Sequence, residues 1–148
     1  MRSSWNVHQD PLFRGDHNAG VQKPVPDADD SIVRHVLYLD GAGRETPYLS
    51  MSEVESTARY FAGRDGKTWK TLVKHARSKD VGHVGMVDLL SMLRGVGKGD
   101  AKWKNALEVM TARKYVEQWS EHLLDFRAHK SSSKEQVEKL IDELFEVE

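Results

Sequence analysis

The sequence predicts a single domain of the α+β class, and three observations carry this prediction. The chain has 148 residues, a length that suits one domain with its own hydrophobic core. Short segments rich in β-branched and aromatic residues, which are typical of strands, occur mainly in its first half. Apolar residues spaced three and four apart, as on one face of a helix, recur in its second half.

The first half begins with alternating strand and turn signals. We expect a short strand over residues 11–17 (PLFRGDH), followed by a long loop over 18–31 that contains two prolines and three aspartates. The segment IVRHVLYLDG (32–41) is rich in β-branched and aromatic residues, so it is predicted to be a second strand. A turn over 41–46 then leads into a third strand, PYLSMS (47–52).

A helix is predicted immediately after this third strand. Ser52 and Glu55 have the spacing of a capping box, and Gly63 stands where a helix over 53–62 should end. Four apolar residues of the segment fall on one helical face: Val54, Ala58, Phe61 and Ala62.

The pattern continues with a strand over 66–74 and a short helix over 87–93. The segment 95–104 is a loop rich in glycine and lysine, and it lacks the Gly-Lys-Ser/Thr ending of a phosphate-binding loop. Residues 106–126 remain ambiguous, because a helical apolar stripe overlaps LEVMT, which would also form a strand.

The C-terminal end is predicted to be an amphipathic helix. Ser133 and Gln136 form a second capping box, after a short linker at 130–133. We therefore divide the chain into a main domain over 1–130 and a terminal helix over 131–148, packed on that domain or on a partner.

The composition excludes several classes of protein and site. The longest apolar runs have four or five residues, whereas a transmembrane helix needs roughly 20. The first ten residues, MRSSWNVHQD, contain no apolar stretch, so we expect no secretory signal and no contact with a membrane. Cysteine is absent, which excludes disulfides, thiolate zinc sites and cysteine nucleophiles.

Charge is distributed unevenly although the formal net charge is only −1. Residues 1–58 carry −4, residues 59–104 carry +7 and residues 105–148 carry −4. The basic segment could attract phosphate, in a nucleotide or in a nucleic acid. The alternative is a solvated face whose charge the acidic C-terminal third balances in the fold.

Polar side chains in the first half suggest a ligand site. Arg14 at a strand end, followed by Gly15, places a bidentate cation beside backbone that a ligand can approach closely. Ser50 and Ser52 put two hydroxyls on one side of a strand that leads directly into a helix. Glu108, after the glycine-rich loop, adds a single carboxylate. Without a ligand, these residues would be a turn arginine, a helix cap and a solvated carboxylate.

Taken in order, these motifs resemble the mono-ADP-ribosyltransferase toxins, in the subclass defined by an arginine, a Ser-x-Ser strand and a glutamate. The phrases TPYLSMS and STARYFAG carry most of the likeness, which covers residues 12–112. The resemblance implies a split antiparallel β-sandwich with flanking helices. It also implies an enzyme that uses NAD as a substrate and no metal.

The resemblance assigns a role to each matching residue. Arg14 would hold the diphosphate of NAD, and the backbone of Gly15 would face the nicotinamide amide. Ser50, with Ser52 nearby, would orient the ribose and the catalytic carboxylate. Phe61 would line the nicotinamide pocket. Glu108 would stabilise the positive charge that develops on the ribose when the nicotinamide bond breaks.

Two alternatives to this assignment remain open. If a helix begins before Glu108, the catalytic carboxylate becomes Glu117 or Glu121. The related histidine–tyrosine–glutamate class of transferases would instead use His35 with Tyr38 or Tyr48, although their spacing fits that class poorly.

The function expected from these motifs is transfer of ADP-ribose from NAD to a macromolecule. Such an enzyme would act in the cytoplasm, as an intracellular protein or as a toxin domain delivered by a bacterial effector and matched by an immunity protein. A non-catalytic module that binds nucleic acid or protein is one alternative, and an NAD hydrolase is another.

The acceptor is expected not to be an arginine side chain. Arginine-modifying members of the family carry Gln or Glu two residues before the catalytic glutamate, whereas Ala106 stands two residues before Glu108. The basic segment 59–104 favours RNA as the acceptor, with an acidic protein surface as the alternative.

Overall fold

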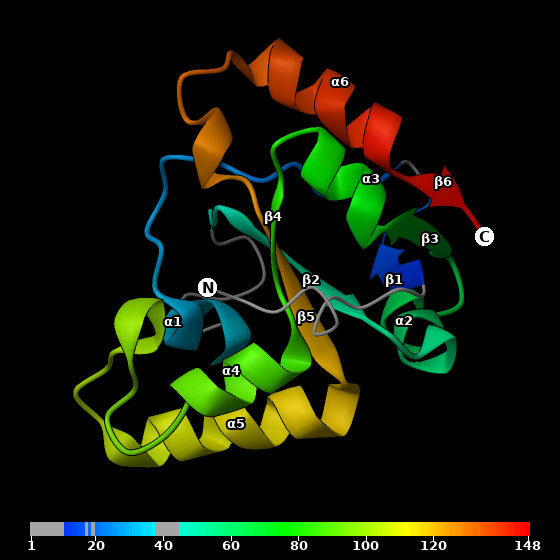
Figure 1. Ribbon diagram of the computed structural model, residues 1–148. Coiled ribbons are helices and arrows are strands. Elements are labelled where there is room, and N and C mark those ends of the chain that lie inside the picture. The colour runs from blue at the N-terminus through cyan, green and yellow to red at the C-terminus, as the bar shows by residue number, and fades with distance from the viewer. Residues whose placement is uncertain (1–10, 17, 19, 38–44) are drawn as a thin grey trace.

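The computed structural model describes residues 11–16, 18, 20–37 and 45–148, which form a six-stranded antiparallel sheet with six helices around it (Figure 1). The strands are β1 (Pro11–Asp16), β2 (Tyr48–Ser52), β3 (Lys67–Leu72), β4 (Gly82–Val84), β5 (Glu121–Asp125) and β6 (Glu146–Val147). The helices are α1 (Ile32–Leu37), α2 (Glu55–Ala62), α3 (Val73–Ser78), α4 (Met86–Met92), α5 (Ala106–Trp119) and α6 (Lys134–Leu144). The predicted α+β class is therefore confirmed.

The sheet has the strand order β4-β5-β2-β1-β3-β6, and it is nearly divided in the middle. Strands β1 and β3 pair from Pro11↔Leu72 to Asp16↔Lys67, along the whole of β1. By contrast, β1 and β2 share the single registered pair Phe13↔Ser52. The two halves of the sheet therefore diverge from this one point, and a space opens between β1 and β2.

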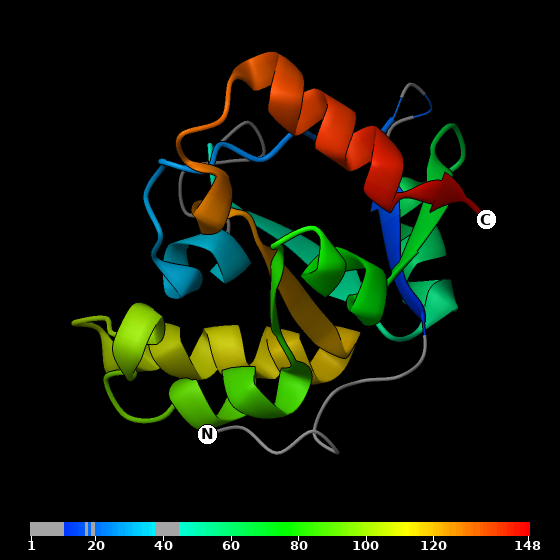
Figure 2. The ribbon, with the colours of Figure 1, turned by 45° about the horizontal axis from the view of Figure 1, so that its top comes forward.

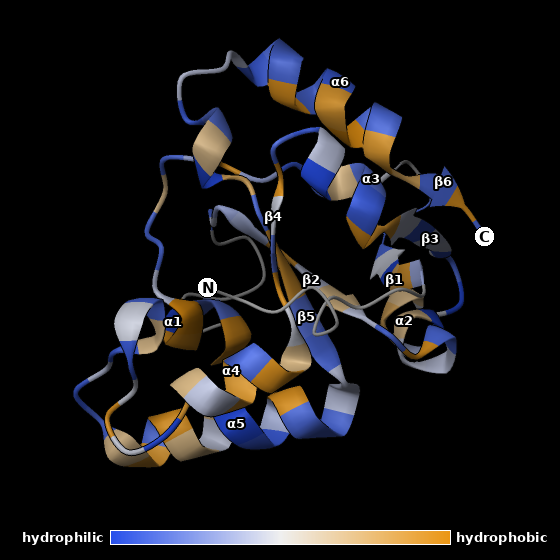
Figure 3. Cartoon of the chain, in the orientation of Figure 1, coloured by the Kyte–Doolittle hydropathy of each residue, from blue (hydrophilic) through white to orange (hydrophobic). Residues whose placement is uncertain are grey.

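Helices cover both faces of the sheet (Figures 1 and 2). One apolar cluster joins the sheet to α3 and α6 through Leu12, Leu49, Val73, Leu124 and Ile141, and Figure 3 shows the apolar side of α6 turned toward it. A second cluster joins the other face to three helices and contains Val33 of α1, Leu89 of α4, Val109 and Val116 of α5, and Leu123 of β5. Because side chains alternate along a strand, neighbouring Leu123 and Leu124 serve opposite clusters.

The C-terminal segment 131–148 packs on the rest of the chain. Helix α6 begins with the predicted capping box, in which Ser133 and Gln136 bond reciprocally. Its residues Leu140 and Ile141 belong to the cluster that also contains Leu12. Strand β6 then pairs with β3 at the edge of the sheet. None of the helices in the described part of the chain is long and apolar enough to cross a membrane.

One predicted strand is wrong, since residues Ile32–Leu37 form helix α1. Ser31 starts this helix by accepting a hydrogen bond from the backbone N–H of Arg34 (3.2 Å). Ile32, Val33 and Val36 are then buried on one face, as helical spacing requires. Tertiary packing has overridden the strand preference of these β-branched residues. Residues 38–44, which contain the rest of that strand and most of the 41–46 turn, lie outside the described ranges.

The other predicted elements are confirmed with shifted boundaries. Strands β1, β2 and β3 match the predictions over 11–17, 47–52 and 66–74, and helices α2 and α4 match those over 53–62 and 87–93. The first capping box does not form, because α2 begins after Val54 and no side chain caps it. The ambiguous segment 106–126 contains both elements, with helix α5 ending at Ser120 in the left-handed conformation (φ 48°) before β5 begins.

An arginine anchors the long loop of residues 18–31 to the sheet. Arg127, just after β5, pairs with Asp125 at the end of that strand (2.8 Å), with Asp100 (2.9 Å) and with Asp30 of the loop (3.2 Å). The hydroxyl of buried Tyr48 donates to the backbone oxygen of the same Asp30 (2.7 Å). The loop is therefore held beside β2, on the way to helix α1.

Glycine at position 15 allows α2 to lie directly on β1. A Cβ atom at Gly15 would overlap the backbone oxygen of Ala58 in α2, and neither backbone can move independently.

We expect Gly15→Ala to lower the free energy of unfolding by about 3 kcal/mol, measured by urea denaturation. At Gly85 a Cβ would meet nothing closer than 3.4 Å, so Gly85→Ala should cost about 1 kcal/mol or less. Equal losses in the two variants would contradict this explanation.

Candidate functional site

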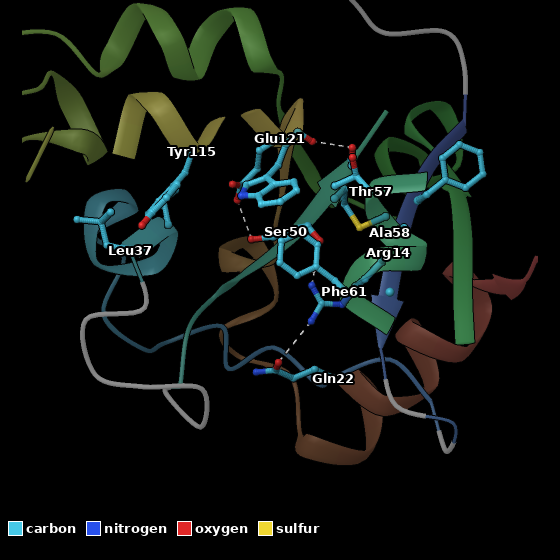
Figure 4. A pocket seen from close by; sticks show the side chains of 15 residues that line it. Arg14, Gln22, Leu37, Ser50, Thr57, Ala58, Phe61, Tyr115 and Glu121 are labelled. Atoms are coloured by element: carbon cyan, nitrogen blue, oxygen red, sulfur yellow. Dashed lines mark hydrogen bonds between the residues drawn. The ribbon is translucent and has the colours of Figure 1, made fainter. Parts of the chain in front are cut away.

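The space between β1 and β2 is a cavity of about 570 Å³, open to solvent on one side (Figure 4). Both strands line it, together with α1, α2, the end of α5 and the start of β5. Its lining includes Phe13, Arg14, Gly15, Gln22, Leu37, Ser50, Met51, Ser52, Thr57, Ala58, Phe61, Tyr115, Trp119 and Glu121. Its size is within the range typical of small-molecule and cofactor sites.

Ser50 occupies the centre of the cavity wall. Its hydroxyl donates a hydrogen bond to Oε2 of Glu121 (2.7 Å), and its backbone oxygen accepts one from the guanidinium of Arg14 (2.9 Å) (Figure 4). One residue of β2 therefore connects a carboxylate on β5 to a cation on β1. Arg14 and Ser50 therefore contact each other at the wall of one cavity.

The guanidinium of Arg14 is held in a fixed orientation. Its Nε donates to Asp16 (2.9 Å), and its terminal nitrogen lies 3.4 Å from the side-chain oxygen of Gln22. The backbone N–H of Gln22 donates to the same Asp16 carboxylate (2.8 Å), which ties the following loop to the strand. A cation fixed in this way at a cavity wall suits a phosphate or diphosphate group.

Glu121 is the carboxylate of the cavity. The backbone pairs Ser52↔Glu121 and Ser50↔Leu123 place it at the start of β5, beside β2. Only 7% of its surface is exposed. Burial raises the pKa of Glu121 from 4.5 to about 7, although the hydrogen bond from Ser50 and the charge of Arg14 act in the opposite direction. The carboxylate is therefore ionised only near and above neutral pH.

Glu108 does not lie in this cavity, and its predicted position is wrong. Helix α5 begins at Ala106, and Asn105 caps it, so Glu108 lies in the first helical turn and not on a strand. Its carboxylate accepts a hydrogen bond from the indole of Trp103 (2.7 Å). The helix rises about 1.5 Å per residue, so its length of roughly 20 Å separates Glu108 from Glu121. Of the two alternative carboxylates, Glu121 lines the cavity, whereas Glu117 is exposed on α5.

The remaining predicted site residues also line the cavity. Gly15 does so, although its missing side chain primarily makes room for α2. The hydroxyl of Ser52 is bonded to backbone groups. It donates to the backbone oxygen of Trp119 (2.7 Å) and accepts from the N–H of Val54 (3.0 Å). Phe61 lies at the mouth of the cavity, with 52% of its surface exposed.

Three aromatic side chains gather beside this mouth, and two of them, Phe61 and Trp119, line the cavity. Tyr60 is stacked on Trp119, with ring centroids 5.4 Å apart and planes inclined by 16°. Phe61 packs on the indole of Trp119 in an edge-to-face arrangement, with ring centroids 4.9 Å apart. Tyr60 is nevertheless 69% exposed. We call Tyr60, Phe61 and Trp119 the aromatic rim. Exposed stacked rings are a common means of binding planar groups.

The histidine–tyrosine alternative places its residues away from the cavity wall. His35 is buried behind Ser50, with Nε2 2.8 Å from the Ser50 hydroxyl. Tyr48 is fully buried, and its hydroxyl donates to the backbone of Asp30. Neither residue lines the cavity, and Tyr38 falls in a stretch that is not described.

Sequence reasoning missed His35 as a neighbour of Ser50, and Trp119 and Tyr115 as lining residues. The apolar stripe through 106–126 gave the one available signal for the second pair. Read as a helix up to Trp119, it places both aromatic residues near its end and leaves EHLLD for a strand. His35 had no such signal, because its segment was predicted to be a strand.

Comparisons with protein-family models, curated protein sequences and solved structures gave no significant match to this chain. Among the described residues, no group of three or more His, Asp or Glu side chains is placed to hold a metal ion.

The raised pKa of Glu121 predicts a specific dependence of stability on pH. The folded protein holds this proton up to about pH 7, whereas the unfolded chain loses it near pH 4.5. Stability from this group is thus fully present below pH 4.5 and decreases as pH rises to 7, by roughly 3 kcal/mol in total. We expect Glu121→Gln to raise the free energy of unfolding by up to that amount at pH 8 and to change little at pH 4.

Urea denaturation at pH 4, 6 and 8 measures this difference. Glu117→Gln is the matched control, because Glu117 is exposed and its pair with Arg113 is a surface pair that should contribute less than about 1 kcal/mol. A Glu121→Gln effect that is the same at all three pH values would show that burial does not hold the proton.

Proposed function

We propose that this protein transfers ADP-ribose from NAD to a macromolecular acceptor, with Arg14, Ser50 and Glu121 as the residues of the reaction. One observation carries the proposal: a buried carboxylate held by a serine hydroxyl shares a cavity with a fixed arginine. This is the combination implied by the resemblance to the arginine, Ser-x-Ser, glutamate transferases, with Glu121 in place of Glu108.

The chemistry explains why these groups are useful together. The bond between C1′ of the ribose and the nicotinamide nitrogen breaks, and its electron pair leaves with nicotinamide. Positive charge then develops on the ribose, and a fixed carboxylate such as Glu121 stabilises it strongly in a site of low dielectric constant. A lone pair of the acceptor attacks C1′, and the acceptor loses one proton.

The cavity supports a position for the diphosphate, the reacting ribose and the nicotinamide ring of NAD. Arg14 has further N–H donors on its two terminal nitrogens, beyond those that bond Ser50 and Gln22, and these suit the diphosphate. Glu121 and Ser50 lie on the neighbouring strands, where the reacting ribose has to be held. Phe61 at the mouth offers an aromatic face for the nicotinamide ring. About 570 Å³ is enough to enclose the reacting half of the dinucleotide.

The acceptor is the less constrained part of the proposal. With Glu121 as the catalytic carboxylate, Trp119 stands two residues before it, and an indole N–H cannot accept a hydrogen bond. The arginine-modifying pattern is therefore absent here too. Within the basic segment 59–104, the glycine- and lysine-rich loop 95–104 is separated from Glu121 by helix α5. The aromatic rim lies closer to the site, and stacking on exposed rings favours an unpaired base of RNA.

Two rival functions use the same cavity differently. An NAD hydrolase would direct water to C1′, and a non-catalytic module would bind its ligand without breaking a bond. Action as a toxin in the cytoplasm, delivered by an effector and countered by an immunity protein, belongs to the same proposal and follows from the resemblance alone.

Glutamine substitutions at two glutamates test the catalytic assignment. We expect Glu121→Gln to lower NAD turnover at least 10²-fold, the typical loss when one preorganised electrostatic group is removed. NAD affinity measured by calorimetry should change little, because the carboxylate acts mainly in the transition state. Glu108→Gln, the matched control outside the cavity, should retain wild-type turnover. Equal turnover in both variants would exclude Glu121, and absence of turnover in the wild type would favour the binding module.

The acceptor is tested with labelled NAD and a cell lysate, followed by separate nuclease and protease digestion. We expect label that nuclease removes and protease does not. Tyr60→Ala should lower transfer about tenfold, the usual contribution of stacking one base, and leave NAD affinity unchanged. Leu107→Ala, at the far end of α5, is a control with similar exposure. Label on protein would refute RNA, and turnover without labelled macromolecule would indicate hydrolysis.

A further inference from the structure

His35 lies directly behind the serine of the site. It comes from helix α1, and only 5% of its surface is exposed. Its Nε2 is 2.8 Å from the hydroxyl of Ser50, and its Nδ1 is 2.8 Å from the hydroxyl of Thr46. The rings of Tyr48 and His35 pack in a T-shaped arrangement, with centroids 5.5 Å apart and planes inclined by 72°, which restricts the plane of the imidazole. The imidazole is thus held between two hydroxyls.

The direction of these hydrogen bonds follows from counting protons. Ionised Glu121 can only accept, so the single hydroxyl proton of Ser50 must point toward it. Toward His35, Ser50 can then offer only a lone pair. Nε2 of His35 must therefore carry a proton and donate it to Ser50.

The far side of the imidazole fits this arrangement. The hydroxyl of Thr46 accepts from the backbone N–H of Tyr48 (3.2 Å), which leaves its own proton available to Nδ1 of His35. A neutral imidazole protonated at Nε2 satisfies the bonds to Thr46 and to Ser50. In this tautomer the donors run in one direction, from the Tyr48 backbone through Thr46, His35 and Ser50 to Glu121.

We infer that His35 is a positioning residue: its Nε2–H holds the Ser50 hydroxyl in the one orientation that donates to Glu121. Without this bond the hydroxyl of Ser50 can rotate about its side-chain torsion, and the carboxylate loses its fixed donor. Glu121 then becomes both less well oriented and harder to ionise, since a hydrogen bond to the carboxylate lowers its pKa. The catalytic consequence rests on the proposed function, whereas the effect on Glu121 does not.

The tautomer of His35 is measured directly by ¹⁵N NMR of the imidazole in the wild-type protein. Above pH 7 we expect the proton on Nε2. A carboxyl ¹³C titration of Glu121 gives its pKa in the same samples. The groups that act on this carboxylate are Arg14 from β1, Ser50 from β2 and, through Ser50, His35 from α1. A proton on Nδ1 and not on Nε2 above pH 7 would overturn the inference.

Two substitutions of His35 separate orientation from packing. Glutamine can place an amide N–H near the position of Nε2, whereas asparagine reaches only the position of Nδ1. We expect His35→Asn to raise the pKa of Glu121 by about half a unit or more and to lower kcat about tenfold, with KM for NAD nearly unchanged. His35→Gln should restore most of both. Equal effects in two folded variants would mean that His35 contributes only packing.

Thr46→Val provides a test if both His35 variants fail to fold. It removes the hydroxyl that bonds Nδ1 while keeping the shape of the side chain, and Thr71→Val is the control at another buried threonine. We expect Thr46→Val to raise the pKa of Glu121 in the wild-type background and to have no further effect in Ser50→Ala. The same shift in both backgrounds would overturn the inference.

The NAD assay and the two NMR measurements separate this inference from the proposed function. If the protein breaks down no NAD, the proposed function fails, but the tautomer of His35 and the titration of Glu121 still decide whether His35 orients Ser50. If NAD is consumed and His35→Asn leaves both the pKa and kcat unchanged, the inference fails alone.

Discussion

The divergence of strands β1 and β2 is the constraint on which the rest of the site depends. The two strands share one registered pair, Phe13↔Ser52, and then separate. Backbone groups beyond that pair need other partners, since a buried polar group without one is costly. The guanidinium of Arg14 supplies such a partner to the backbone oxygen of Ser50. The contact that gives this backbone oxygen a hydrogen-bond donor therefore also places a cation beside the cavity.

The contact from Arg14 stabilises the fold, whereas the ionised carboxylate of Glu121 destabilises it. Its surroundings raise its pKa to about 7, so the folded protein resists the ionised form that the proposed reaction uses. A less buried carboxylate would be easier to ionise, but solvent would also weaken its field at the ribose. The hydrogen bond from Ser50 offsets part of the cost, and the bond from His35 keeps that hydroxyl directed. Burial of Glu121 thus lowers the stability of the folded protein and strengthens the field of the carboxylate at the ribose.

Sequence patterns predicted those parts of the fold that depend on local signals. The strand that carries Arg14, the Ser-x-Ser strand and the capping box at Ser133 follow from turn residues, alternation and spacing. Glu121 needed one further fact, the end of helix α5, which a left-handed Ser120 sets and no glycine marks. His35 depended on α1, whose β-branched residues favour a strand until packing against other helices makes them helical.

Helices α1 and α5 connect these two failures physically. They pack on each other in one apolar cluster, in which Val33 and Val36 of α1 meet Val109, Ala112 and Val116 of α5. Burial of the α5 stripe fixes the rotation of that helix, and so directs Tyr115 and Trp119 to the cavity. Burial of the α1 residues likewise directs His35 to Ser50. The apolar cluster therefore places both Trp119 of the aromatic rim and His35 of the hydrogen-bonded chain, and neither can be assigned from its own segment alone.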